Sequence, residues 1–416
     1  MYKERRNKLF NRLGDQSITI LFSGKAPQKT SDQNYYFTVN RNFFYLTGIN
    51  QEESVLLLIK GNNTTSSFLF IEKTDPVKAL WDGAGISFED ASEIADIPIE
   101  NIREINTLKG FISQLLTTSR RALYGPIDTF YFDLERQNEE AAKNPAEYFA
   151  RYLLDLYPFV QIKTCQMELA ELRMIKDETE VKDMQKAIAI TKLALDNVMS
   201  TLKPGMFEYQ VEAEFNYVLN YHNAINSFNT IAAQGKNATI LHYIDNDSKL
   251  EDNNLILLDL GVYYQNYASD ISRTYPINGK FTRRQKEVYQ VVLDANKAAI
   301  SQLKAGMTIK QFNDIGRQVL IDGAKKLGLI KEDHEINRYY YHSLGHYLGL
   351  DVHDVGNYSL PIPEGAVITV EPGLYIAEEN IGIRIEDNCY VTKDGCINLS
   401  KAIVKEIDEI EAFMKK

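Results

Sequence analysis

Apolar runs and helix-like stretches alternate through the first 160 residues of the chain. Three apolar runs have the length of strands: residues 17–22, 54–59 and 67–71. Two longer stretches are helix-like: residues 108–121 and 135–156. Because strands that alternate with helices build layered α/β folds, we predict an α/β N-terminal domain over residues 1–160.

A second domain is expected to follow a boundary between residues 157 and 171. Tyr157 and Pro158 end one helical pattern, and DETEVKDMQKAIAITKLALDNVMS begins at Asp177. Asp177 and Glu180 have the spacing of a capping box. Apolar residues then recur at helical spacing: Val181, Met184, Ile188, Leu195 and Val198. We therefore place an α+β C-terminal domain at residues 171–416, with a long helix near its start.

The C-terminal domain contains an internal repeat. TLKPGMFEYQVEAEF begins at Thr201 and QLKAGMTIKQFNDIG begins at Gln302, a spacing of 101 residues. Each copy follows one helix-like stretch, precedes another, and is followed by β-rich sequence that carries two acidic residues. A chance match over so few letters is the alternative, but the identical order of elements favours a duplicated unit with a pseudo-twofold axis.

The first β-rich segment, LILLDLGVYYQNYASDISRTYP, predicts a hairpin that turns near Gln265 and Asn266. Asp259 and Asp270 average to a point near this turn, so we expect them directly opposite one another. Like charges opposite each other in a sheet are destabilising, and burial beside leucines adds to the cost. Either one aspartate is protonated or a cation lies between the two.

The second β-rich segment decides between these alternatives. ITVEPGLYIAEENIGIRIEDN places Glu371 and Glu386 at equal distances from a polar centre at Glu378 and Glu379. This pair is also expected to face across a hairpin. Four buried carboxylates, with His346 upstream in HSLGHYLGLDVHD, predict a metal site for Mn, Co, Fe or Zn. Two divalent ions would balance the four negative charges and leave room for a bridging hydroxide.

Composition sets limits on partners and location. The net charge of −11 argues against nucleic acid and anionic membranes as partners. The three cysteines are widely spaced and odd in number, which suits a reducing compartment. The first residues form no apolar run typical of a signal peptide, and no segment reaches the roughly 20 apolar residues of a membrane helix. We expect a cytoplasmic protein.

Several segments around the acidic residues carry a resemblance to a known family. They are LDLG, ASDISRTYPINGKFT, SLGHYLGLDVHDVG, TVEPGLY and GIRIEDN. They resemble aminopeptidase P and prolidase, metallopeptidases with the pita-bread fold. In the N-terminal domain FFYLTGIN is similar to a segment of these proteins, and Trp81 matches a tryptophan that precedes a glycine. From the sequence alone, Trp81 is a packing residue.

The resemblance implies roles for individual residues. The metal ligands are implied to be Asp259, Asp270, His346, Glu371 and Glu386. The other histidines implied to act at the site are His353, which stabilises the tetrahedral intermediate, His242, which borders the substrate-binding cleft, and His342, which lines the site. The alternative is that His242 and His342 only cap or fill. Arg384 is implied mainly to orient and charge-balance the carboxylates, and the alternative is that it also contacts substrate. Glu371 is implied to carry a proton from the nucleophile to the leaving nitrogen.

The family also implies a reaction, a cofactor and an assembly. The expected activity is removal of the first residue from peptides with proline in second position, with two divalent ions, preferably Mn²⁺. Co²⁺, Zn²⁺ and Fe²⁺ fit the same ligands. The N-terminal domain of the family can overhang an active site of its own or a neighbouring subunit, so a homodimer or homotetramer is expected.

Two alternatives stay open from the sequence. A prolidase would cleave only Xaa-Pro dipeptides, and an inactive pita-bread module would only bind, although such modules have typically lost ligands. The chain also departs from the family in two places. Its segment GNYSLPIPEGA lacks an arginine found in a longer loop of bacterial relatives, and Asn388 replaces a frequent aspartate.

Overall fold

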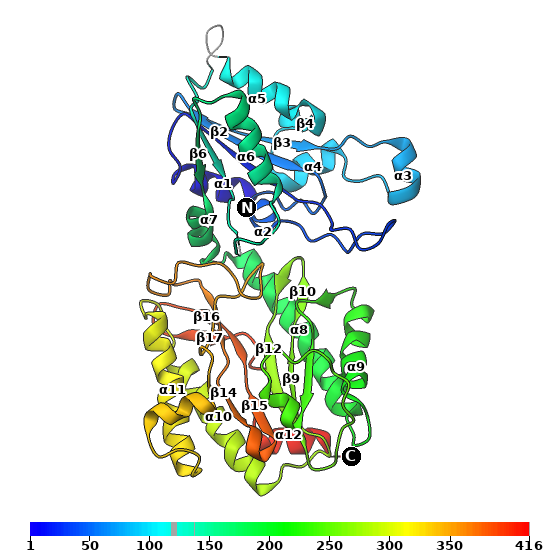
Figure 1. Cartoon of the computed structure of the whole chain (residues 1–416), viewed down its shortest axis with the longest axis vertical. Coiled ribbons are helices and arrows are strands. Elements are labelled where there is room, and N and C mark those ends of the chain that lie inside the picture. The colour runs from blue at the N-terminus through cyan, green and yellow to red at the C-terminus, as the bar shows by residue number, and fades with distance from the viewer. Residues whose placement is uncertain (118–122, 137, 416) are drawn as a thin grey trace. The chain divides into compact units, whose positions relative to one another are not determined.

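The computed structural model of the chain describes residues 1–117, 123–136 and 138–415. It divides into two compact units, Met1–Arg173 and Met174–Lys416, which we describe separately (Figure 1). Among the helices of the described residues, none has both the length and the apolar character that crossing a membrane requires.

The first unit is built on a six-stranded sheet with the order β4-β3-β2-β1-β5-β6. β2 pairs antiparallel with β1 and β3, and the other neighbours pair in parallel. The strands are β1 (Ser17–Phe22), β2 (Val55–Gly61), β3 (Thr64–Ile71), β4 (Ile102–Glu104), β5 (Thr129–Phe132) and β6 (Gln161–Thr164). The helices are α1 (Tyr2–Phe10), α2 (Arg41–Thr47), α3 (Pro76–Asp82), α4 (Phe88–Ala95), α5 (Leu108–Leu116), α6 (Pro145–Leu156) and α7 (Gln166–Arg173).

Helices lie on both faces of this sheet. Ile18, Leu57 and Phe130 share a buried cluster with Leu153 of α6 and Ile112 of α5. On the opposite face the Lys60 ammonium donates to carbonyls at the end of α1. This arrangement confirms the predicted α/β layer.

Four details of the first unit differ from the predictions. Helix α6 begins at Pro145 and not at residue 135, because the Asn144 side chain caps it and proline suits the first helical position. Helix α5 ends at Leu116; residues 118–121 of the predicted helix lie outside the described residues. The unit also continues beyond residue 160, because β6 extends the sheet beside β5 and α7 follows it. The side chain of Trp81 is 84% exposed, so it is not a packing residue within one chain.

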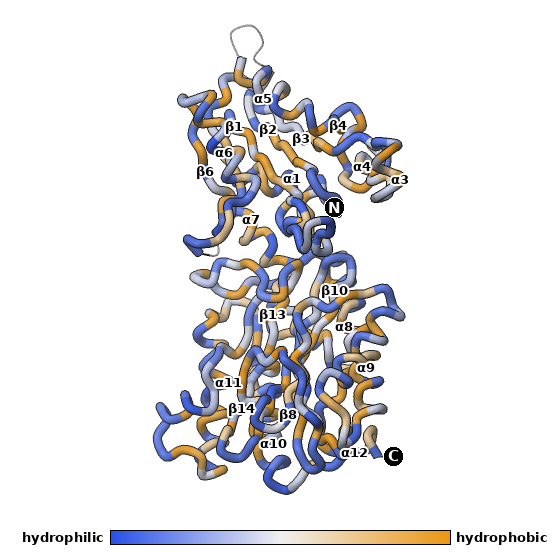
Figure 2. The backbone as a smooth tube through the Cα atoms, turned by 45° about the vertical axis from the view of Figure 1, so that its right-hand side comes forward, coloured by the Kyte–Doolittle hydropathy of each residue, from blue (hydrophilic) through white to orange (hydrophobic). Residues whose placement is uncertain are grey.

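The second unit has two helix pairs around short antiparallel sheets. Its helices are α8 (Glu178–Thr201), α9 (Glu208–Tyr221), α10 (Arg283–Gln302), α11 (Ile309–Lys326) and α12 (Ile407–Met414). Its strands are β7 (Ile225–Asn226), β8 (Ile231–Gln234), β9 (Leu255–Leu260), β10 (Val262–Tyr264), β11 (Tyr267–Ala268), β12 (Ile271–Pro276), β13 (Val367–Val370), β14 (Gly373–Ile376), β15 (Ile381–Arg384), β16 (Asp387–Val391) and β17 (Cys396–Asn398). Orange and blue alternate along the helices in Figure 2, as amphipathic helices require. Leu195 of α8, Val292 of α10 and Leu258 of β9 belong to one buried cluster.

The internal repeat is visible in the helix pairs. α8 and α10 end 101 residues apart, at Thr201 and Gln302, and α9 and α11 begin 101 residues apart. Gly205 and Gly306 turn the chain between the helices with φ of +90° and +86°, a conformation that favours glycine. Each donates its N–H to a distant carbonyl at 2.9 Å, that of Leu250 or of Ile362. The duplicated unit is confirmed at the level of these connections.

The two hairpins behave differently. In the second, Val370 pairs with Asp387 and Gly373 with Arg384, so Glu371 lies opposite Glu386, as predicted. In the first, the predicted register was wrong, because Asp259 pairs with Ser272.

The cause is the turn of the first hairpin. Gln265 and Asn266 both have positive φ, and Tyr264 pairs with Tyr267, so the turn is centred between Gln265 and Asn266. Asp270, two residues before Ser272, is therefore a diagonal neighbour of Asp259 on the same face.

Candidate metal centre

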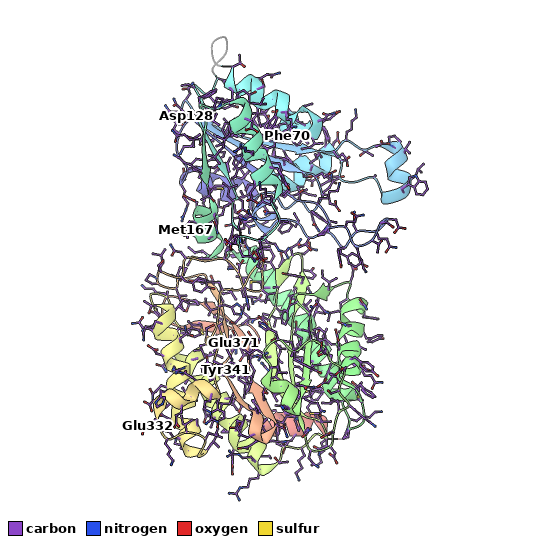
Figure 3. All side chains as sticks on the ribbon, in the orientation of Figure 1. Phe70, Asp128, Met167, Glu332, Tyr341 and Glu371 are labelled. Carbon is purple, nitrogen blue, oxygen red and sulfur yellow. The ribbon has the colours of Figure 1, made fainter. Side chains whose placement is uncertain are left out.

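Breaks in the strand ladders position most of the predicted ligands. Asp259 lies near the end of β9, and Asp270 lies just before β12. Glu371 and Glu386 occupy the gaps between β13 and β14 and between β15 and β16. Their N–H groups leave the hairpin, because Glu371 donates to Leu344 O at 2.8 Å and Glu386 donates to Ser272 O at 3.0 Å. Figure 3 shows Glu371 among the strands in the middle of the second unit.

The ligand atoms of Asp270, His346 and Glu386 lie within 4.8 Å of one another. His346 Nε2 is 3.5 Å from Asp270 Oδ2 and 3.6 Å from Glu371 Oε1. Asp259 lies outside the group of three and is held at 2.6 Å by Arg384 Nη2. The structure thus places the five residues around one region, with three of them forming a compact set.

The imidazole of His346 is oriented by the backbone. Its Nδ1 lies 2.9 Å from Tyr347 O. Because a carbonyl only accepts, Nδ1 carries a proton, and Nε2, which faces the carboxylates, is the nitrogen that can bind a cation. The loop reaches this position because the neighbouring Gly345 has no side chain; a Cβ there would lie 1.9 Å from Thr369 O.

Burial makes the carboxylate cluster costly without a cation. It raises the pKa of Glu371 to about 7 and raises the pKa values of Asp270 and Glu386 as well. Burial opposes the charged form of His346 too, but Asp270 and Glu371 outweigh it and raise its pKa to about 9. A divalent cation would reverse this penalty and stabilise the ionised carboxylates.

Two oxygen atoms indicate where a cation fits. Asp259 Oδ1 and Glu386 Oε1 are buried and have no hydrogen-bond partner among the described residues. Buried acceptors of this kind are uncommon in proteins. With the imidazole lone pair, they make the oxygen-rich ligand set that Mn, Fe, Co and Zn accept. The residues present therefore fit a metal centre.

Arg384 ties the two hairpins together. Its guanidinium donates to Asp259 Oδ2 at 2.6 Å, to Ser272 Oγ at 2.8 Å and to Tyr375 Oη at 2.9 Å. Ser272 Oγ in turn donates to Glu386 Oε2 at 2.8 Å. These contacts support the interpretation that Arg384 orients the carboxylates.

Asn388, where the sequence departs from the family, contacts the backbone of Asp270 in both directions. Its Oδ1 accepts from Asp270 N at 3.2 Å, and its Nδ2 donates to Asp270 O at 2.5 Å. A carboxylate could accept the first bond but could not donate the second. The amide side chain of Asn388 therefore makes a pair of hydrogen bonds to the Asp270 backbone that an aspartate could not make.

The three other histidines predicted to act at the site differ in exposure. His342 is partly buried, and its Nε2 lies 2.8 Å from Tyr375 Oη. Burial and Arg384 lower its pKa to about 4, which keeps the ring neutral. His353 is exposed, and its ring centre lies 4.2 Å from that of His346. His242 is also exposed, and its charge lowers the pKa of both His342 and His353, so all three belong to one neighbourhood.

Sequence reasoning missed Tyr375 and Ser272. Tyr375 accepts from Arg384 and contacts His342, and Ser272 lies between Arg384 and Glu386. The sequence could have indicated Tyr375, because it follows Glu371 by four residues in the hairpin and an even spacing in a strand favours the same face. Ser272 was missed because the hairpin was paired about a centre one residue too early; pairing about a centre between Gln265 and Asn266 places Ser272 opposite Asp259.

Comparison with known proteins gives consistent results. Residues 182–393 match metallopeptidase family M24, and residues 2–124 match the aminopeptidase P N-terminal domain. The chain is 36% identical to a Xaa-Pro aminopeptidase of Haemophilus influenzae, covering 99% of this chain and 96% of that protein.

Solved structures agree over the full length. A Bacillus anthracis structure proposed to be an aminopeptidase P superposes with a TM-score of 0.96 at 42% identity, covering 100% of this chain and 97% of that one. Aminopeptidase P of Escherichia coli, solved with the inhibitor Pro-Leu, gives a TM-score of 0.89 at 32% identity, covering 99% and 97%. The ligand geometry, both domain matches and these similarities lead to one conclusion: the chain belongs to metallopeptidase family M24 and has the two-domain architecture of aminopeptidase P.

Proposed function

We propose that the protein is a metal-dependent Xaa-Pro aminopeptidase that binds two divalent ions, with Mn²⁺ preferred. The observation that carries the proposal is the compact group of Asp270, His346 and Glu386, with the partly buried Glu371 and Asp259 beside it and unpartnered oxygens on Asp259 and Glu386 among the described residues. When bound, such ions supply Lewis acidity and lower the pKa of coordinated water toward 7. The relatives' names support the aminopeptidase over the prolidase alternative.

Glu371 is the proposed proton carrier. Its carboxylate lies 3.6 Å from His346 Nε2 and 3.8 Å from His342 Nδ1, within the cluster where water would be activated. Burial raises the pKa of Glu371 to about 7 in the metal-free protein, and bound cations would lower it, which would leave an ionised carboxylate able to accept a proton. Glu371 would take the proton from the nucleophile and deliver it to the departing nitrogen.

The proposed roles of the histidines follow from their exposure. His242 and His353 are exposed and can meet a peptide, whereas His342 is held between Ser343 O and Tyr375 Oη. His353 is proposed to donate to the oxyanion, and His242 to border the bound peptide. Arg384 is fully engaged with Asp259, Ser272 and Tyr375, so it acts on substrate only through those groups.

The substrate is proposed to have proline in second position. The bond before proline is a tertiary amide whose nitrogen carries no hydrogen, so an enzyme must recognise it without an N–H donor. The E. coli aminopeptidase P was solved with Pro-Leu, the fragment that would remain after removal of a first residue.

The test is a cleavage assay by mass spectrometry on protein stripped of metal and reloaded with Mn²⁺. It compares an Xaa-Pro-Xaa tripeptide, an Xaa-Pro dipeptide and an Xaa-Ala tripeptide. We expect release of the first residue from the Xaa-Pro tripeptide. Cleavage of the dipeptide alone would identify a prolidase, and no metal-dependent cleavage of any peptide would contradict the proposal.

We also propose a cytoplasmic location and a homodimer or homotetramer. Cys165, Cys389 and Cys396 are all free thiols, which a reducing compartment maintains. The exposed side chains of Leu80 and Trp81 on α3 are typical of a surface that a second subunit covers. Sedimentation analysis of the wild type beside Trp81→Ser tests the assembly.

A further inference from the structure

Asn296 is a polar residue in an apolar part of helix α10. Its side chain is fully buried, and its neighbours Val292, Leu293, Ala295 and Ala299 are fully buried apolar residues. A buried amide is costly unless its donors and acceptor are all used. The contacts of Asn296 therefore show why a polar side chain is tolerated there.

The Asn296 amide reaches the backbone on both sides of the second hairpin. Its Nδ2 donates to Val370 O at 3.0 Å and to Ile385 O at 3.2 Å. Val370 immediately precedes Glu371, and Ile385 immediately precedes Glu386. One side chain thus holds the residue before each of the two glutamates.

These contacts occur where the hairpin lacks its regular ladder. The β13–β16 pairing ends at Val370 and Asp387, and the β14–β15 pairing begins at Gly373 and Arg384. Between them, the N–H groups of the two glutamates bond to other segments of the unit. Asn296 supplies hydrogen bonds at this gap, so the separation of the two strands depends on it.

The acceptor side of Asn296 joins a buried ion network. Its Oδ1 accepts from Lys405 Nζ at 2.7 Å, and Lys405 also lies 2.5 Å from Asp387 Oδ2. The other oxygen of Asp387 accepts from Arg273 Nη2 at 2.9 Å. Arg273 Nη1 then donates to the carbonyl of Glu386 at 2.6 Å. Asn296 is therefore also linked to the backbone of Glu386, through Lys405, Asp387 and Arg273.

We propose that Asn296 is a positioning residue of the metal centre, which sets the spacing of Glu371 and Glu386 through their backbones. This inference rests on the metal-dependent function proposed above. Metal sites require ligands held within about 0.5 Å of the productive geometry. Residues that orient ligands through hydrogen bonds typically change metal affinity 10–100-fold when replaced.

The test is Mn²⁺ titration of metal-free protein by calorimetry, without peptide. Asn296→Leu has a similar volume and removes both donors and the acceptor. Asn296→Asp keeps the acceptor that faces Lys405 but replaces the donor to the two carbonyls by a second, negatively charged acceptor oxygen. Val292→Ala, on the same helix, lowers stability through a cavity but removes no polar contact.

We expect both Asn296 variants to bind Mn²⁺ about 10–100-fold more weakly at one or both sites, and Val292→Ala to bind within about threefold of wild type. Wild-type affinity in folded Asn296→Asp, judged by circular dichroism, would overturn the proposal. An equal loss in Val292→Ala would overturn it too, because the effect would then reflect stability alone.

The titration separates this inference from the proposed function. The titration measures Mn²⁺ binding without catalysis. A wild type that binds Mn²⁺ but cleaves no Xaa-Pro peptide would contradict the proposed function, and the affinities of the Asn296 variants would still test the role of Asn296. A wild type that binds no Mn²⁺ would contradict both.

Discussion

Glu371 shows at the scale of one residue how burial makes a carboxylate depend on a cation. Its carboxyl is crowded by other acids, and burial raises its pKa to about 7 from an ordinary value of 4.5. In a metal-free protein such a group favours the protonated form, and a bound cation would favour the ionised form.

Metal-free protein is expected to lose stability as pH rises. Between about pH 4.5 and 7 the folded protein keeps a proton on Glu371 that the unfolded chain has released, so the free energy of unfolding falls as pH rises. His346 acts in the same direction, since its pKa of about 9 lies above the ordinary 6.5. His342, whose pKa of about 4 lies below the ordinary 6.5, acts in the opposite direction up to about pH 6.5, so the fall is expected mainly above that pH. Urea unfolding of chelator-treated protein at pH 5, 7 and 9 measures the trend, and Glu371→Gln should remove the part of the fall that Glu371 contributes below pH 7. A rise in stability between pH 7 and 9 would contradict the prediction.

Glu371→Gln is expected to lower kcat by roughly 10²–10⁴-fold, because glutamine cannot transfer the proton. Steady-state kinetics on an Xaa-Pro tripeptide measures the effect. Glu378→Gln is the matched control, since Glu378 lies in the exposed turn of the same hairpin and contacts Tyr339 instead of the metal ligands. Equal activity of the two variants would exclude Glu371 as the proton carrier.

Asn388→Asp is expected to weaken metal binding roughly tenfold and to cost about 1–3 kcal/mol of stability. The aspartate would place an acceptor against Asp270 O, which Asn388 now contacts as a donor. Asn398→Asp is the control, because Asn398 uses only its oxygen, which accepts from Ser400. Mn²⁺ titration and thermal unfolding of both variants decide whether the donated bond matters.

At the scale of elements, the two hairpins show what the sequence could and could not predict. The register of the second hairpin was predicted correctly from the midpoint of Glu371 and Glu386, because the turn is centred on the polar residues at that midpoint. The register of the first failed because the midpoint of Asp259 and Asp270 lies between Tyr264 and Gln265, whereas the turn is centred one residue later, between Gln265 and Asn266.

Contacts over long sequence separations could not be predicted either. Asn296 meets carbonyls 74 and 89 residues away, and no local pattern marks such partners. The α/β class of the first unit was predictable because strand-length apolar runs alternate with helices. The start of α6 at Pro145 depended on a cap that periodicity alone does not show.

The loop that carries His346 depends on a close backbone approach. Gly345→Ala would place a Cβ 1.9 Å from Thr369 O, a backbone atom that cannot rotate away. We expect it to displace the imidazole, lower the midpoint of thermal unfolding and weaken Mn²⁺ binding. Gly110→Ala in α5 is the contrasting case, since a Cβ there meets nothing within 4 Å. Gly110→Ala should raise the free energy of unfolding by about 0.5–1 kcal/mol. Destabilisation by both the Gly345 and the Gly110 variants would contradict the steric argument.

At the scale of the whole molecule, every predicted metal ligand belongs to Met174–Lys416. Anything that binds only the folded form stabilises the segments that hold it. Adding Mn²⁺ to metal-free protein should therefore slow hydrogen exchange in β9, β12, β13 and β15, and leave β1 and β2 of the first unit unchanged. Exchange measured by mass spectrometry at matched pH tests this, and equal slowing of β1 would place the binding site elsewhere.

The repeat makes the predicted metal centre a property of both halves together. Each half of the second unit brings two acids, Asp259 and Asp270 or Glu371 and Glu386, and neither pair alone supplies the full ligand set. The halves are not interchangeable, because His346 lies in the second half alone. Either half expressed without the other is therefore expected to lack the complete set of predicted ligands.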